Sequence, residues 1–164
     1  KVMGGQQPLV LNLQMGFAEG LYDPANDPDI AYAHLFSYFK GEEWRTQKET
    51  QRLLDKYFTT KPDGIPGNDD TGTMSAWAIF NMIGFYPDCP GLPEYTLTTP
   101  VFNKVTIRLD PKWYKENELV IESNRTGSET LYINKVLLDG KKFNKYRITH
   151  DELVHGKRLI FDLK

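Results

Sequence analysis

The pattern of apolar residues changes once along the chain, and this change limits the possible folds more than any other feature. In residues 1–86, the apolar residues of the longer runs recur at helical spacing. In residues 87–164, short β-branched segments alternate with polar residues, as is typical of strands. Residues 85–100, at the junction, contain four of the ten prolines. We therefore predict an α+β chain, with a helical part over residues 1–86 and an antiparallel β-sheet or sandwich over residues 87–164.

Helices and strands can be assigned within these two parts. The aromatic-rich run 29–39 predicts a helix that is buried on most sides. Two further helices are expected over about 43–58 and 73–83. The segment Leu138-Asp-Gly-Lys141 predicts a hairpin, because Asp-Gly suits a type I′ turn. The expected strands are 95–98, 101–109, 119–122, 131–138 and 159–163.

Composition argues against several classes of protein. The 20 Lys and Arg residues are balanced by 22 Asp and Glu, so the chain lacks the basic surface that nucleic-acid binding requires. No apolar run reaches the ~18–20 residues needed to cross a bilayer. The single Cys89 excludes an intrachain disulfide. Because the chain begins at Lys1 and opens within an apolar run, we expect it to be a segment of a longer protein.

The loop 67–72, Gly-Asn-Asp-Asp-Thr-Gly, is the most informative stretch of the sequence. It places Asn68, Asp69 and Asp70 directly before the helix expected over 73–83. The partial positive charge of a helix N-terminus favours an ionised carboxylate, which can activate water as a general base or bind a hard cation. Asp and Thr are also common N-cap residues, so a simple helix cap explains the same pattern.

A second acidic loop precedes the first expected helix. Residues 22–29 include Asp23, Asn26, Asp27 and Asp29, and calcium takes side-chain oxygens of this kind as ligands. The structural alternative is that Asp27 or Asp29 only caps the helix. If the two acidic loops converge, they would together form one cleft for a divalent cation.

Four motifs carry a resemblance to a known family. They are Asn26-Asp27-Pro28, Gly41-x-x-Trp44-x-Thr46-Gln47, Gly64-Ile-Pro-Gly-Asn-Asp-Asp-x-Gly-x-Met-Ser-Ala-Trp77 and Gly84-Phe-Tyr-Pro87. In this order and spacing they resemble glycoside hydrolase family 92, the calcium-dependent α-mannosidases that release terminal mannose with inversion. The resemblance covers nearly all of residues 20–164. It implies that the helical part forms the last helices of an (α/α)6 barrel, followed by closing β strands.

The resemblance also implies roles for individual residues. Asp70 falls on the general base of the family, and Asn68 falls on an assisting position that is often acidic. Asn26 and Asp27 fall on calcium ligands, so calcium is the expected cofactor. The general acid of the family has no counterpart in the chain and is expected outside it. The expected substrate contacts are Tyr22, Asp23, Asp69 and Trp44.

The expected function is therefore part of an exo-acting α-mannosidase. Its partners would be a mannose-containing glycan and the missing N-terminal part of the same parent chain, and its location would be periplasmic or secreted, by analogy with the family. The segment alone, without the general acid, is expected to be inactive. The alternative is a non-catalytic carbohydrate-binding or interdomain module in which both acidic loops are helix caps. Helices cut from a barrel are also expected to expose Phe36, Phe39, Trp44 and Trp77.

Overall fold

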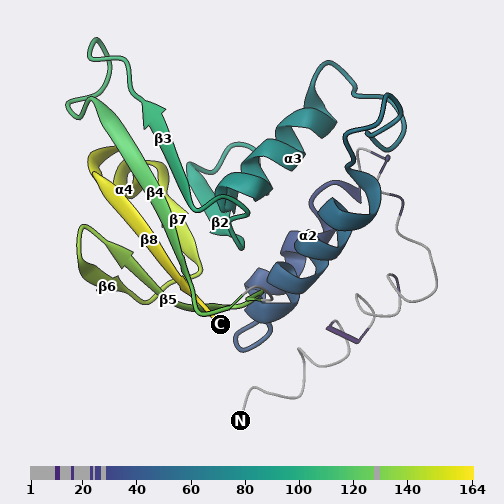
Figure 1. Ribbon diagram of the computed structural model, residues 1–164, viewed down its shortest axis with the longest axis horizontal. Helices are drawn as coiled ribbons and strands as arrows, with labels where there is room; N and C mark the ends of the chain where they lie inside the picture. The colour runs from purple at the N-terminus through teal and green to yellow at the C-terminus, as the bar shows by residue number, and fades with distance from the viewer. Residues whose placement is uncertain (1–9, 12–15, 17–22, 24, 27–28, 128–129) are drawn as a thin grey trace. The chain divides into compact units, whose positions relative to one another are not determined.

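The computed structural model of the chain (Figure 1) describes residues 10–11, 16, 23, 25–26, 29–127 and 130–164. These residues fall into two compact units, Lys1–Ala78 and Ile79–Lys164. The division lies inside a helix, shortly before the change in sequence pattern at residue 86. The first unit carries both acidic loops, and the second carries the sheets.

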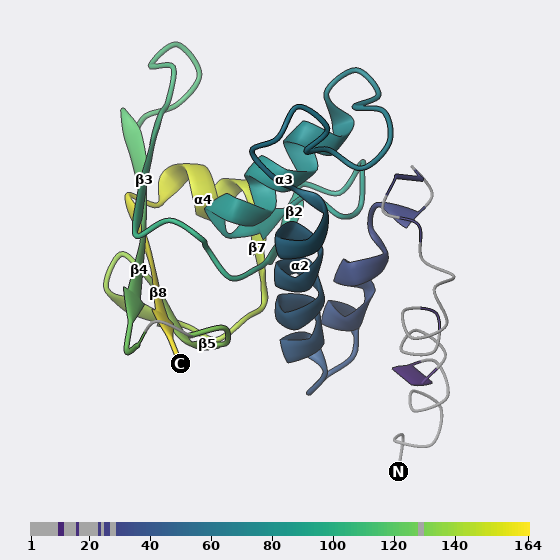
Figure 2. The same ribbon diagram turned by 45° about the vertical axis from the view of Figure 1, so that its right-hand side comes forward.

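The described part of the first unit is helical. The 3-10 helix η2, Tyr32–Tyr38, packs beside the α-helix α2, Glu43–Tyr57, as Figure 2 shows. The helix α3, Thr73–Ile83, begins in this unit and continues into the second. The two helices expected over about 43–58 and 73–83 are therefore confirmed.

The α-helix expected over residues 29–39 is wrong in type and length. The amide of His34 donates to the carbonyl of Ala31 at 2.9 Å, which is the three-residue step of a 3-10 helix. Side chains three residues apart share one face of such a helix. Ala33 and Phe36 have this spacing and are 0% and 1% exposed. The three-residue repeat of the 3-10 helix therefore places both of these apolar side chains on its buried face.

Thr46, on the buried face of α2, supplies a test of packing. Its side-chain hydroxyl is buried and has no hydrogen-bond partner in the part of the chain that the structure describes. Thr46→Val keeps the shape of the side chain and removes a hydroxyl that is costly to bury, so we expect the free energy of unfolding to rise by about 1 kcal/mol. Native-state hydrogen exchange of the α2 amides measures this change. The control is Thr50→Val, which removes a hydroxyl that does have a partner, because the Thr50 hydroxyl donates to the Thr46 carbonyl at 2.7 Å. Faster exchange in Thr46→Val than in wild type would contradict the expectation.

The second unit is built from two sheets and a short helix. The smaller sheet has the strand order β1-β2-β7, and the larger has the order β3-β4-β8-β5-β6. The strands are β1 Phe85–Tyr86, β2 Glu94–Leu97, β3 Lys104–Arg108, β4 Glu118–Arg125, β5 Ile133–Leu138, β6 Lys141–Phe143, β7 Arg147–Thr149 and β8 Arg158–Leu163, and the helix α4 is His150–His155. The strand pairs are antiparallel except β4 and β8, which run parallel.

The inner faces of the two sheets share one core. Ile121 of β4 and Phe161 of β8 are at most 1% exposed, and they belong to the same buried cluster as Leu97 and Ile148 of the smaller sheet. Residues along β8 alternate between buried and partly exposed, as a strand with one face in a core requires. The expected α+β class with a β-sandwich part is confirmed.

The hairpin between β5 and β6 has the expected turn. Asp139 and Gly140 have φ of 50° and 76°, and a type I′ turn needs positive φ at both positions. Leu138 pairs with Lys141 across the turn. The hairpin prediction is confirmed.

Tyr86, in β1, makes the second unit sensitive to high pH. Burial, and then the charge of Asp88, raise the pKa of the Tyr86 phenol from 10.0 to about 12. The folded-state pKa of Tyr86 lies above the unfolded value, so the unfolded chain loses its phenol proton first as the pH rises. The free energy of unfolding is therefore unaffected by Tyr86 below pH 10 and falls as the pH rises towards about 12. Tyr86→Phe should remove this part of the pH dependence from the unfolding free energy. An unchanged dependence between wild type and Tyr86→Phe would contradict the assignment.

Candidate functional site

Asp69 acts as the cap of α3. Its Oδ1 accepts a hydrogen bond from the backbone amide of Ser75 at 2.8 Å, and its Oδ2 accepts one from the Ser75 hydroxyl at 2.9 Å. The Asp69 carbonyl accepts from the amides of Gly72 and Met74. Amides of the first helical turns are thereby satisfied, as a helix N-terminus requires. Asp69 could therefore contact a substrate only through the lone pairs that Ser75 leaves open.

Asp70 has a different environment from its neighbour. Its backbone and that of Thr71 both adopt left-handed conformations, with φ of 45° and 62°. The Asp70 carbonyl holds this turn, because it accepts the Thr73 hydroxyl at 2.7 Å. The Asp70 side chain is exposed, and no described residue donates a hydrogen bond to its carboxylate. Left-handed backbone at β-branched Thr71 is costly, and such strain clusters at functional sites.

The loop before η2 is organised by its own acidic residues. Asp29 Oδ2 accepts a hydrogen bond from the backbone amide of Asp23 at 3.2 Å and one from the Asn26 side chain at 3.5 Å. Asp23 Oδ1 accepts from the amide of Ala25 at 2.9 Å. Asp23 and Asp29 thus fix a turn that presents Asn26, whose side chain is exposed. Tyr22 and Asp27, named from the sequence as a substrate contact and a calcium ligand, lie outside the described residues.

The two acidic loops meet. A Cβ placed on Gly67 would lie 2.6 Å from the Cβ of Ala25, so only glycine lets the loops approach this closely. Gly67 also has a φ of 64°. A second link comes from Trp77, whose indole Nε1 donates to the carbonyl of Ile30 at 2.9 Å. The expected convergence of the loops is found, although the sequence did not show which residues make it.

Each of the two loops carries exposed side-chain oxygens of the kind that calcium binds. Asn26 follows Ala25 in one loop, and Asp70 lies three residues after Gly67 in the other. Among the described residues there is no group of three or more His, Cys, Asp or Glu side chains placed to hold a metal ion. The donor set thus fits a hard cation in chemical type, with Asp27 outside the described part of the chain. Calcium at this place stays a prediction.

Some of the aromatic side chains that were expected to be exposed are buried. Phe36 and Trp77 are 1% and 2% exposed, so the prediction that they are exposed is wrong. The reason for Trp77 is local, because Phe58 stacks on its ring at a centroid distance of 5.4 Å. Trp44 is 38% exposed, and the Arg45 guanidinium carbon lies 4.4 Å from its ring centroid. A sugar contact at Trp44 stays a prediction.

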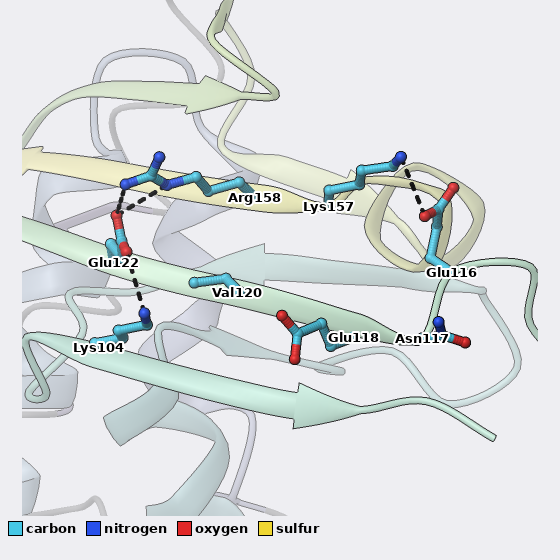
Figure 3. Close-up of a pocket in the computed structure, with 8 residues that line it drawn as sticks. All are labelled: Lys104, Glu116, Asn117, Glu118, Val120, Glu122, Lys157 and Arg158. Carbon is cyan, nitrogen blue, oxygen red and sulfur yellow. Dashed lines mark hydrogen bonds and ion pairs between the residues drawn. The ribbon is translucent and has the colours of Figure 1, made fainter. Parts of the chain in front are cut away.

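A separate groove of about 730 Å³ lies on the outer face of the larger sheet (Figure 3). Arg158 pairs with Glu122, and Lys157 Nζ lies 3.4 Å from Glu116 Oε2. The residues that line the groove include no aromatic side chain on which a sugar could stack and none of the site residues named from the sequence. The full lining is Lys104, Glu116, Asn117, Glu118, Val120, Glu122, Lys157 and Arg158.

Comparison with known proteins bears on this site. The model of the glycosyl hydrolase family 92 catalytic domain matches residues 1–164. A family GH92 alpha-mannosidase from Bacteroides thetaiotaomicron has a similar structure, with a TM-score of 0.87 and 30% identity over 98% of this chain and 22% of that chain. A family GH92 inverting mannosidase from the same species gives a TM-score of 0.76 and 34% identity over 94% of this chain and 20% of that chain.

Two further matches agree with these. A second structure of the first alpha-mannosidase, in complex with mannoimidazole, gives a TM-score of 0.78 and 33% identity, over 87% of this chain and 18% of that chain. A protein described as an uncharacterized secreted glycosidase, from Arthroderma benhamiae, is 27% identical over 96% of this chain and 20% of its own length. The chain thus spans about a fifth of the length of these relatives.

Proposed function

Because the chain belongs to glycosyl hydrolase family 92, we propose that it forms the base-bearing part of the active site of an exo-acting α-mannosidase. The full-length enzyme would hydrolyse terminal α-linked mannose from glycans. One observation carries the proposal: the exposed Asp70 carboxylate has no hydrogen-bond donor among the described residues and sits on a strained turn, in the loop whose Gly67 touches the other acidic loop. The substrate class is supported by a relative that is described as an alpha-mannosidase and has also been solved in complex with mannoimidazole, and by a second that is described as an inverting mannosidase.

In the proposed mechanism, Asp70 is the general base of an inverting hydrolysis. Asp70 takes a proton from a water molecule as the water oxygen bonds to the anomeric carbon. The glycosidic bond breaks at the same time, and its oxygen takes a proton from a general acid that another part of the full-length chain supplies. An inverting enzyme holds its acid and base about 6.5–9.5 Å apart, which leaves room for the water. Asn68 would help to orient that water.

Calcium is the proposed cofactor, and Asn26 and Asp27 are its proposed ligands. When bound, it would supply electrostatic stabilisation to sugar hydroxyls and favour a distorted ring. The residues of this chain would hold the sugar beside the cation, and the proposed contacts are Tyr22, Asp23, Asp69 and Trp44. We also propose a periplasmic or secreted enzyme. This location is supported by the relative described as secreted. Separately, no helix in the described residues is long and apolar enough to span a membrane.

The second candidate is a non-catalytic carbohydrate-binding or interdomain module. It is favoured by one group of observations: Asp69 caps α3, while Asp23 and Asp29 stabilise a turn, so three of the acidic residues have structural tasks. Calorimetric titration of the full-length protein with calcium discriminates between the two candidates. Binding that Asp27→Ala abolishes supports the enzyme, whereas no binding supports the module.

Metal removal tests the proposed function directly. Treatment of the full-length protein with a calcium chelator should abolish release of mannose from an α-mannoside, and added calcium should restore it. Added magnesium is the control, because it demands a smaller octahedral site and sheds its waters reluctantly. Full activity in the presence of the chelator would rule calcium out of the proposal.

A further inference from the structure

Trp77 joins three segments of the first unit. Its indole is 2% exposed and stacks on Phe58, at the end of α2, with an angle of 16° between the rings. The edge of His34, in η2, contacts the same indole at a centroid distance of 6.1 Å. Its Nε1 donates to the carbonyl of Ile30 at 2.9 Å. This single side chain therefore contacts η2, the end of α2 and the segment before η2.

The hydrogen bond between Trp77 and Ile30 joins the two acidic loops, because each of its residues lies next to one of them. Ile30 directly follows Asp29, which holds the turn that presents Asn26. Trp77 lies in the second turn of α3, two residues after Ser75, which donates to the Asp69 side chain. The hydrogen bond between Trp77 and Ile30 thus connects the residue that follows one acidic loop to the helix that starts at the other.

We propose that Trp77 is a positioning residue, whose hydrogen bond to the Ile30 carbonyl sets the separation between the cation-binding loop and the Asp70 loop. The inference rests on the proposed function, because it assigns Asn26 to the cation and Asp70 to the reacting water. Trp77 is buried and acts on the reaction only through these loops.

The two loops also touch at Gly67 and Ala25. Gly67 and Ala25 touch without a hydrogen bond that the structure records, so van der Waals contact there limits the closest approach but does not hold the loops together. The indole N–H supplies a directional restraint, in a partly buried place where a hydrogen bond is stronger than in water. Partners that hydrogen-bond a metal-ligating side chain change metal affinity by about 10–100-fold when they are removed. Trp77 acts one step further away, through the backbone of Ile30, so its effect should lie at the lower end of this range.

The test uses Trp77→Phe in the full-length protein, with calcium affinity measured by calorimetry on metal-free protein. Phe keeps an aromatic ring against Phe58 and removes the N–H donor. We expect the calcium Kd to rise by about tenfold and kcat to fall, because both loops lose their common restraint. The measurement of calcium binding does not depend on turnover.

Two controls separate positioning from general destabilisation. Phe58→Leu removes the stacked ring and lowers the melting temperature but leaves the bond from Trp77 to Ile30 in place, so its calcium Kd should stay within about twofold of wild type, a difference of under half a kcal/mol. Trp113→Phe changes a tryptophan that is 72% exposed and should alter neither quantity.

Each outcome decides the inference. A selective loss of calcium affinity in Trp77→Phe supports it. Wild-type affinity in Trp77→Phe, or an equal loss in Phe58→Leu, overturns it while leaving the proposed function intact. If the wild-type protein binds no calcium and releases no mannose, the proposed function fails together with the inference.

Discussion

Replacement of Asp70 by Asn in the full-length protein is expected to lower kcat for α-mannoside hydrolysis by about 10²–10⁴-fold. The amide keeps the size and the left-handed backbone preference of the side chain but cannot take a proton from water. Since no described residue donates a hydrogen bond to the Asp70 carboxylate, the substitution breaks no described contact, and the fold should be unchanged. Initial rates and a thermal melt, measured on the same preparation, test both parts.

Asp63→Asn is a matched control. Asp63 is an exposed carboxylate in the same glycine- and proline-rich stretch of the chain, so the charge change is equal and the distance along the chain is small. Asp63→Asn should retain wild-type kcat. Turnover near the wild-type rate in Asp70→Asn, or an equal loss in both variants, would contradict the role of Asp70 as the base.

Replacement of Arg147 by Met is expected to destabilise the second unit by about 3–5 kcal/mol. The Asp88 side chain is 1% exposed and lies 3.2 Å from Arg147 through each of two nitrogen–oxygen contacts. Arg147 also donates to the Thr96 hydroxyl at 2.8 Å. Met fills a similar volume but leaves the buried Asp88 carboxylate without its cation. Native-state hydrogen exchange of the β2 amides measures this loss within the full-length protein.

The exposed ion pair of Arg158 supplies the control for this prediction. Arg158 is 56% exposed and pairs with Glu122 on the outer face of the sheet. Exposed pairs contribute about 0–1 kcal/mol, so Arg158→Met should have a small effect. The double variant Arg147→Met with Asp88→Leu should recover part of the stability, because no buried charge remains. Equal losses from Arg147→Met and Arg158→Met would contradict the importance of the buried pair.

The regular parts of the fold were predictable because they depend on local patterns. The α2 and α3 helices follow the helical spacing of apolar residues, and the turn at Asp139 follows the preference of type I′ turns for Asp-Gly. The helix α4 was missed although Thr149 and Glu152 form a capping box, a signal visible in the sequence. The parallel pairing of β4 with β8 depends on partners far apart in the chain, and no local pattern reveals it.

The residues of the candidate site could be predicted from the sequence, but the separate roles of neighbouring residues could not. The sequence favoured Asp70 as the base and Asp69 as a substrate contact, but it left open that either residue only caps the helix. Backbone geometry separates them, because Ser75 engages Asp69 and the left-handed turn presents Asp70. The contact of Trp77 with Ile30 joins residues 47 positions apart, so its role could be recognised only in the folded chain.

Proton NMR of an α-mannoside during digestion by the full-length protein, with calcium present, tests the central claim most directly. Single displacement by a water that Asp70 activates predicts that β-mannose appears first and that α-mannose follows by mutarotation. The appearance of α-mannose as the first product would contradict the claim, because it requires a second displacement and a nucleophile in place of the base.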